Sequence, residues 1–302
     1  MGSTTRPVAR TADRIGARPE EPSLRRSLVL PVGIVASALL FALAVGPWIS
    51  LRGVAGPVIA MSERPALAAL ATLGCLAVGI AIAAGVGRLI NAVVGMFALG
   101  CGLGILAMRA GTVEDLAFSG AAAGATLRGM AIETLLWAVA IGAASVVTFR
   151  ISGPLPDAVD VDDPRLDGPF GRNAFLALAA GLVVLPAAWL LALSPMKGQA
   201  LGAVVVGSML AGLGGRLLAP RVAPVLLFAA PCLAAALGQA VLSTIVPAAA
   251  PIGDLYVAQQ IPRIAVPMPI DWAAGGTAGI ALGIGWSRSF LKTEPERRPR
   301  RR

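Results

Sequence analysis

The chain has 302 residues, of which 57% are hydrophobic and 14% charged, with a mean hydropathy of +0.80 and a net charge of +9. Soluble domains carry about 25% charged residues, so this composition excludes an ordinary soluble protein and indicates a membrane protein. The chain contains no histidine, which excludes histidine-ligated haem, most catalytic zinc sites and histidine general bases.

The apolar runs are continuous and about twenty residues long, the length that a helix needs to cross a bilayer. A transmembrane β-barrel would instead alternate apolar and polar residues in segments of about ten. We therefore expect an all-α polytopic membrane protein with eight transmembrane helices. In chain order these predicted spans are 28–48, 66–87, 89–108, 130–149, 174–193, 198–218, 223–246 and 271–288.

Three polar segments flank or join the predicted helices. Residues 1–27 form a basic N-terminal tail and residues 291–302 a basic C-terminal tail, and we expect both to be disordered. Residues 151–173 are rich in aspartate, proline and glycine, as is typical of a solvated linker. The end of the C-terminal tail, "RRPRRR", should lie against anionic headgroups of membrane lipids. The positive-inside rule explains the basic residues of the termini and loops without a nucleic-acid partner.

The basic residues also predict an orientation. With the N-terminus in the cytoplasm, 19 of the 25 lysines and arginines fall on the cytoplasmic side, which fits the positive-inside rule. An even number of spans then places both termini in the cytoplasm, and we expect the inner (plasma) membrane of a bacterium. A cleaved signal peptide is an alternative, because the chain starts basic and "ALA" at 42–44 resembles a cleavage site.

The two halves of the chain share an ordered series of short matches. "VGMFALGCGLGIL" (94–106) aligns without gaps with "VLLFAAPCLAAAL" (225–237). Three further pairs keep the same order, namely Arg88 with Arg216, Asp115 with Asp254, and Glu133 with Asp271. We interpret the series as a tandem duplication, with four-helix repeats at 28–150 and 174–290. Four spans return the chain to the same side, so the repeats should be parallel.

Small residues and prolines suggest how the helices pack. Helices approach closely in lipid where small side chains line their contacts. The predicted packing glycines are Gly100 and Gly104 in the third span and Gly275, Gly279 and Gly283 in the eighth. Pro186 and Pro231 lie inside predicted spans and should distort them.

Charged residues gather where each fourth span begins, in the order acid, base, acid. The first half supplies Asp115, Arg128 and Glu133, and the second supplies Asp254, Arg263 and Asp271. These residues have two interpretations. In the first, Glu133 and Asp271 each cap their helix and form a salt bridge with the preceding arginine. In the second, all six residues form a polar vestibule between the repeats, which binds a small solute, a lipid headgroup or a partner protein.

The sequence leaves the function open between three classes. A duplicated bundle favours transport or permeation of a small solute or lipid, whereas few buried polar residues favour a structural or assembly subunit of a larger membrane complex. A membrane-embedded enzyme acting on lipid is the third class, but no residue pattern predicts a catalytic site, a cofactor or a bound metal. The expected partners are membrane lipids and other membrane subunits; the oligomeric state is open.

Overall fold

A computed structural model describes residues 24–153, 155, 171–220 and 224–290. The described chain is helical and contains no strand, only isolated β-bridges. This confirms the predicted all-helical class. The C-terminal tail, nearly all of the N-terminal tail and most of the 151–173 linker lie outside the described residues.

Long and short helical segments follow one another in the same order in the two halves. The first half consists of α1 (Leu24–Leu43), α2 (Pro65–Leu89), α3 (Ala92–Arg109), the short α4 (Val113–Ala117) and α5 (Ala123–Ser152). The second consists of α7 (Arg172–Ala180), η3 (Gly181–Val183), α8 (Val184–Leu191), α9 (Lys197–Leu218), η4 (Leu226–Ala229), α10 (Ala230–Ile245), the short α11 (Ile252–Val257), η5 (Arg263–Ala265) and α12 (Pro269–Ser287). Two further 3₁₀ turns, η1 (Gly46–Trp48) and η2 (Ile59–Met61), lie between α1 and α2.

Helix type changes at both prolines inside the predicted spans. Pro186 has no N–H to donate to the carbonyl of Leu182, and the preceding turn is the 3₁₀ segment η3 between α7 and α8. Pro231 occupies the first turn of α10, directly after the 3₁₀ turn η4. The fifth and seventh predicted spans are therefore each built from two kinds of helix.

Six helical segments in the described chain are long and apolar enough to cross a membrane. They are Pro65–Leu89, Ala92–Arg109, Ala123–Ser152, Arg172–Leu191, Lys197–Leu218 and Leu226–Ile245. Of the other two predicted spans, the first corresponds to a shorter apolar helix, Ser27–Leu43. The eighth corresponds to α12, which has 19 residues but is rich in glycine. A multi-pass membrane protein is thus supported, and eight spans remain a prediction.

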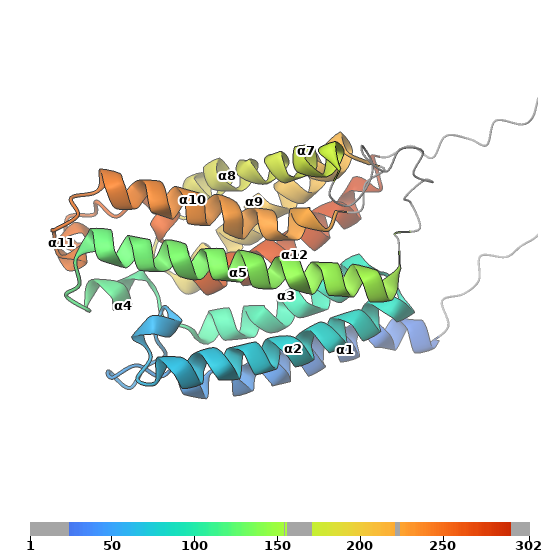
Figure 1. Cartoon of the computed structure of the whole chain (residues 1–302), viewed down its shortest axis with the longest axis horizontal. Helices are drawn as coiled ribbons and strands as arrows, with labels where there is room; N and C mark the ends of the chain where they lie inside the picture. Colours follow the sequence, from blue (N-terminus) through green and yellow to red (C-terminus); the bar gives the residue numbers. More distant parts are fainter. Residues whose placement is uncertain (1–23, 154, 156–170, 221–223, 291–302) are drawn as a thin grey trace, which may run out of the picture.

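The long helices lie side by side along the long axis of the molecule, so their termini gather at its two opposite ends (Figure 1). The short helices α4 and α11 lie together at one end, which we call the short-helix end. The beginning of α1 and the end of α12 lie at the other, which we call the arginine end because its described charged residues are all arginines. Those whose side chains the structure describes are Arg88, Arg150, Arg172, Arg216 and Arg288.

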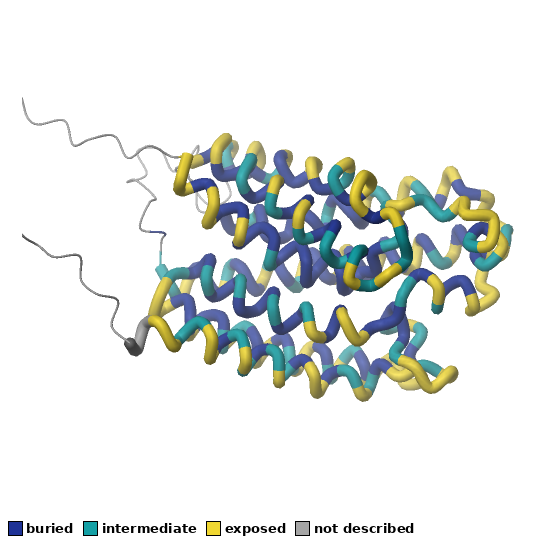
Figure 2. The backbone as a smooth tube through the Cα atoms, turned by 180° about the vertical axis from the view of Figure 1, so that it is seen from behind, coloured by how far each residue is buried: buried dark blue, intermediate teal, exposed yellow. Residues whose placement is uncertain are grey.

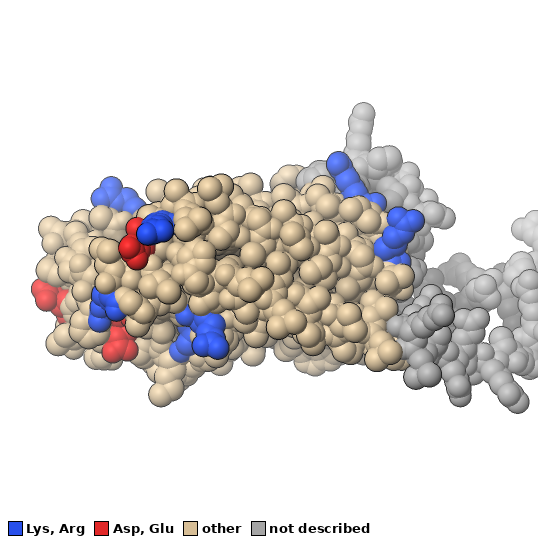
Figure 3. Space-filling model, turned by 90° about the horizontal axis from the view of Figure 1, so that it is seen from below, with Lys and Arg blue, Asp and Glu red and all other residues tan. Residues whose placement is uncertain are grey.

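The surface between these two ends is apolar. In Figure 3 the charged side chains on the visible face lie towards the ends, with an uncharged band between them. Large apolar side chains are exposed along the outer helices, for example Leu39 on α1, Leu70 on α2 and Leu136 on α5. Exposing such an apolar surface to water would cost free energy, whereas exposing it to lipid acyl chains would not. The exposed band is what a membrane-embedded bundle requires.

The glycine-rich α12 lies inside the bundle, since most of its residues are buried; Figure 2 shows that buried backbone fills the middle of the molecule. It packs most extensively against α9 and next against α3, while α5 packs chiefly against α10. The fourth long helix of each half therefore contacts the third helix of the other half. Because these contacts cross between the halves, the halves form one body rather than two adjacent bundles.

The glycines of α12 allow its close contact with α9. A Cβ added to Gly279 or Gly283 would collide with the α9 backbone, and one added to Gly275 would press tightly on Val204. A Cβ on Gly100 would similarly collide with Ala278 of α12. Gly104 differs, because a Cβ there would meet open space, so the prediction that Gly104 lies at a helix contact is wrong.

Candidate functional site

The six residues of the predicted vestibule all belong to the short-helix end, but they are not one cluster. Asp115 and Asp254 lie in the first turns of the short helices α4 and α11, which pack against each other. Asp271 lies in the first turn of α12, as expected. Glu133 lies well inside α5, which begins at Ala123, so the expectation that Glu133 is in a first turn is wrong.

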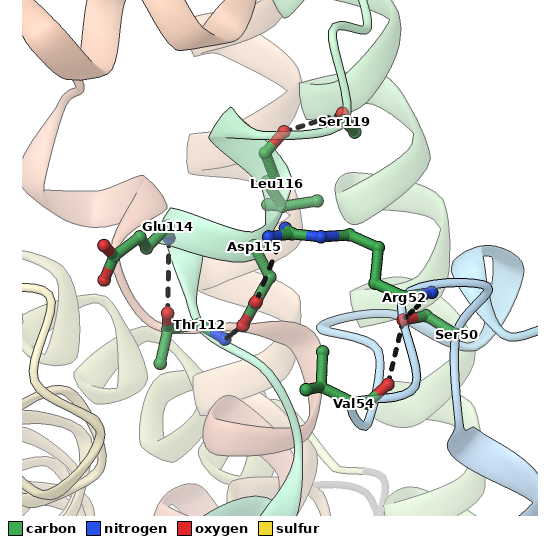
Figure 4. A network of polar contacts seen from close by, with 8 residues as sticks. All are labelled: Ser50, Arg52, Val54, Thr112, Glu114, Asp115, Leu116 and Ser119. Atoms are coloured by element: carbon green, nitrogen blue, oxygen red, sulfur yellow. Dashed lines mark hydrogen bonds and ion pairs between the residues drawn. The ribbon is translucent and has the colours of Figure 1, made fainter.

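Asp115 stabilises the start of its own helix (Figure 4). Its carboxylate accepts a hydrogen bond from the backbone N–H of Thr112 at 2.8 Å, while the Thr112 hydroxyl accepts from the N–H of Glu114, completing a capping box. Arg52 approaches the same carboxylate at 3.9 Å and lies over the Phe118 ring. The Arg52 and Asp115 side chains are 52% and 28% exposed, so this is a surface pair of small energy.

The two arginines of the predicted series do not pair with the acids that follow them. The Arg128 Nε donates to the carbonyl of Gly124 one turn earlier in α5. The Arg263 guanidinium lies over the ring of Trp189, 5.4 Å from its centre, in a cation–π contact. Neither arginine forms a salt bridge with Glu133 or Asp271, so that part of the capping interpretation is wrong.

Asp271 pairs instead with Lys197, the first residue of α9. The Lys197 Nζ lies 2.9 Å from Oδ1 and 3.1 Å from Oδ2 of Asp271, and it also donates to the carbonyl of Gly111 at 2.9 Å. Asp271 further accepts from the N–H of Met268 at 2.8 Å. The Lys197 and Asp271 side chains are 12% and 1% exposed. This buried ion pair joins α9 and α12 to the first half of the chain through Gly111.

Glu133, the sequence counterpart of Asp271, holds a loop. Its Oε2 accepts a hydrogen bond of 2.9 Å from the N–H of Ile59, at the start of η2. Residues 44–64 fold back over the short-helix end, held by bridges between Ile49 and Ala55 and between Ser50 and Ser62. The acid of the fourth long helix thus anchors the segment between the first two helices in the first half, whereas in the second half it binds the first residue of the second long helix, α9.

The matched arginines occupy equivalent places at the arginine end. Arg88 lies in the last turn of α2 and Arg216 in the last turn of α9, the second long helix of each half. Arg88 is exposed, whereas Arg216 is 2% exposed and has an interaction partner. Their positions follow the order of the sequence matches, and their environments differ.

An apolar cavity of about 530 Å³ opens between the two halves; we call it the first groove. It is bounded by α5 of the first half and by α7, η3 and α10 of the second. Its lining residues are all apolar, and they are Ala131, Ile132, Leu135, Phe175, Leu178, Ala179, Leu182, Ala230, Leu233, Ala234, Ala236, Leu237 and Ala240. Several of them, including Ile132, Phe175 and Leu237, belong to the exposed apolar surface. The groove therefore opens towards the lipid-facing side.

A second cavity of about 410 Å³, the second groove, has the corresponding position in the other half. It is bounded by α1 and α3 of the first half and by α12 of the second. Each groove thus lies between the first and third long helices of one half and the fourth of the other. The second groove reaches the arginine end, where Asn91 and Arg288 line it.

Within the described ranges, no group of three or more histidine, cysteine, aspartate or glutamate side chains is arranged to hold a metal ion. The cysteines are free thiols, and Cys232 is buried. No protein-family model, curated protein or solved structure matches the chain.

Sequence reasoning missed the role of Lys197 and both grooves. The signal for Lys197 was available, because it is the only lysine between two predicted spans in the second half. The grooves left no sequence signal, since their alanines and leucines resemble those of any other apolar helix face.

Proposed function

We propose that the protein is an eight-span membrane protein made of two parallel four-helix repeats, which binds a lipid or a similarly apolar molecule and mediates its passage through the membrane. The proposed orientation places the arginine end in the cytoplasm of a bacterium and the short-helix end outside the inner membrane. The proposed role is binding and permeation, without a catalytic step.

The single observation that carries this proposal is the first groove. Ligand cavities commonly measure about 300–1,000 Å³ and are mostly apolar. The groove falls within that range, has only apolar lining residues and opens towards the exposed apolar band. A polar solute would lose its hydration there without gaining hydrogen bonds, whereas an acyl chain would lose nothing. The geometry therefore favours the lipid alternative over the small polar solute.

The duplication is supported by the order of the helices. Arg88 and Arg216 each end the second long helix of their half, and Asp115 and Asp254 each begin a short helix. The crossed packing of α3 on α12 and of α10 on α5 is what a twofold axis along the membrane normal would generate. The same twofold axis would also relate the two grooves, since each lies between the first and third long helices of one half and the fourth of the other.

The proposal is tested by filling the first groove. Ala179 is exposed and lines it, so Ala179→Phe places a ring in the cavity without displacing a buried side chain. The full chain is reconstituted into liposomes, and transbilayer movement of a fluorescent phospholipid is followed by quenching from one side. We expect wild type to accelerate this movement and Ala179→Phe to slow it roughly tenfold, the factor that about 1.4 kcal/mol gives.

The matched control is Ala77→Phe. Ala77 is also an exposed alanine of a long apolar helix, α2, and lines neither groove. It should behave as wild type. A wild-type protein that does not accelerate lipid movement, or an Ala179→Phe variant as active as Ala77→Phe, would overturn the proposal.

A second candidate function is a structural or assembly subunit of a larger membrane complex. It is favoured by the tight contact of α12 with α9, where added Cβ atoms at Gly279 and Gly283 would meet α9 backbone. Such a closely packed interface is suited to a static scaffold. Purification in mild detergent with mass spectrometry separates the two, because a stoichiometric protein partner would favour the subunit.

A further inference from the structure

The second groove differs from the first in its chemistry. Leu30, Phe97, Leu282 and Trp286 give it an apolar wall, but Asn91 and Arg288 line it as well. Arg288 follows the last residue of α12 and is exposed. A molecule lying in this groove would have its apolar part between α1, α3 and α12 and would meet a cation at the arginine end.

The positive charge of the arginine end favours a ligand that carries a negative charge. The described charged residues there are all arginines, so an anionic group is attracted and a cationic one repelled. A guanidinium has five N–H donors in a planar fork that matches a phosphate, so Arg288 is able to bind a phosphate in addition to its other contacts. The Asn91 Oδ1 accepts from the N–H of Val94, which leaves the Asn91 amide group as a donor.

We propose that the second groove binds one anionic phospholipid, with its phosphate at Arg288 and Asn91 and an acyl chain along Phe97, Leu282 and Trp286. This proposal rests on the membrane placement given above, but not on lipid movement through the first groove. Trp286 is exposed near the end of α12, where an indole ring suits the boundary between headgroups and acyl chains.

Gly285 provides a way to block the site without disturbing the fold. It lines the second groove, and a Cβ added to it would meet no atom within 4 Å. Gly285→Leu should therefore fill the groove. Gly74→Leu is the matched control, because Gly74 lies in α2, lines neither groove and also faces open space. Arg288→Gln removes the cation, and Arg150→Gln is its control, because Arg150 is an exposed arginine in the last turn of α5.

The experiment is native mass spectrometry of the full chain in detergent, with phosphatidylglycerol or phosphatidylcholine added at equal concentration. We expect wild type to retain one phosphatidylglycerol in preference to phosphatidylcholine. Arg288→Gln should lose the preference several-fold, Gly285→Leu should lose the bound lipid, and both controls and Ala179→Phe should retain it.

Three outcomes would overturn the assignment. Equal retention of the two lipids by wild type would show that the groove does not select an anionic headgroup, because both lipids carry a phosphate. Unchanged retention in Gly285→Leu would place the lipid elsewhere. Equal losses in Arg150→Gln and Arg288→Gln would indicate diffuse attraction to the arginine end. None of these results depends on lipid movement, so this proposal and that for the first groove fail separately.

Discussion

At the scale of single residues, two sequence-matched acids have different partners. Asp271 binds the Lys197 cation, whereas Glu133 binds the backbone N–H of Ile59. The matching of the acids was visible in the sequence, but their partners were not. Arg128 and Arg263 are nearer along the chain, yet helix packing brings Lys197 to Asp271 from a distance of 74 residues. Sequence separation is a poor guide to pairing once helices pack side by side.

The burial of Lys197 and Asp271 predicts a large effect of breaking their pair. Lys197→Met leaves the Asp271 carboxylate without its cation in a position that is 1% exposed, and such losses typically cost about 3–5 kcal/mol. We therefore expect a marked fall in the thermal unfolding temperature in detergent.

The control for this pair is Arg52→Met, which removes the exposed partner of Asp115. Exposed pairs are worth about 0–1 kcal/mol, so its unfolding temperature should stay close to that of wild type. Equal effects of the two substitutions would contradict the assignment of Lys197 and Asp271 as a buried pair.

At the scale of helices, α12 shows what a glycine pattern does and does not predict. The spacing of Gly275, Gly279 and Gly283 indicated a smooth face, and that face lies against α9. The same reasoning was correct for Gly100 and wrong for Gly104, although both are in α3. Two helices that cross at an angle separate away from the crossing point. Gly100 lies where α3 meets Ala278 of α12, and Gly104 lies one turn further along.

A glycine-to-leucine substitution should therefore lower the unfolding temperature at Gly283, which faces α9, but not at Gly104, which faces open space. Gly283→Leu would force a side chain into the α9 backbone, and overpacking of this kind typically costs about 1–3 kcal/mol or more. Gly104→Leu enters open space and should leave the unfolding temperature nearly unchanged. Circular dichroism during heating in detergent measures both, and a Gly283→Leu variant as stable as Gly104→Leu and wild type would contradict the close contact of α12 with α9.

At the scale of the whole molecule, composition predicted the helical class, and charge predicted which ends of the helices belong together. The fold of the 44–64 loop and the grooves could not be predicted from the sequence, because they depend on contacts between residues far apart along the chain. The corresponding connection between α8 and α9 covers only 192–196. The halves thus share an order of helices but not the shape of their connections.

The orientation is open to a direct test with two matched serines. Ser119 and Ser289 are both exposed, and each hydroxyl donates to the carbonyl three residues earlier. They lie beside α4 at the short-helix end and just beyond α12 at the arginine end. In intact cells, a thiol reagent that cannot cross the membrane should label Ser119→Cys but not Ser289→Cys.

Cell lysis should expose Ser289→Cys to the same reagent, which checks that this cysteine is reactive. The wild-type chain reports any background from the native cysteines, all of which lie in long helices. Labelling of Ser289→Cys in intact cells would reverse the proposed orientation.

The buried position of α12 has a consequence for how the protein is made. Among the described long helices, α12 is the last to leave the ribosome, yet it fills the space between α3, α9 and α10. A helix so rich in glycine gains little from lipid and much from close partners, so its entry depends on helices that are already in the membrane. Until then, the Gly100 face of α3 has no partner. Closure of the bundle therefore waits for α12, and a chain stopped before residue 269 would leave the faces of α3 and α9 that α12 covers without their partner.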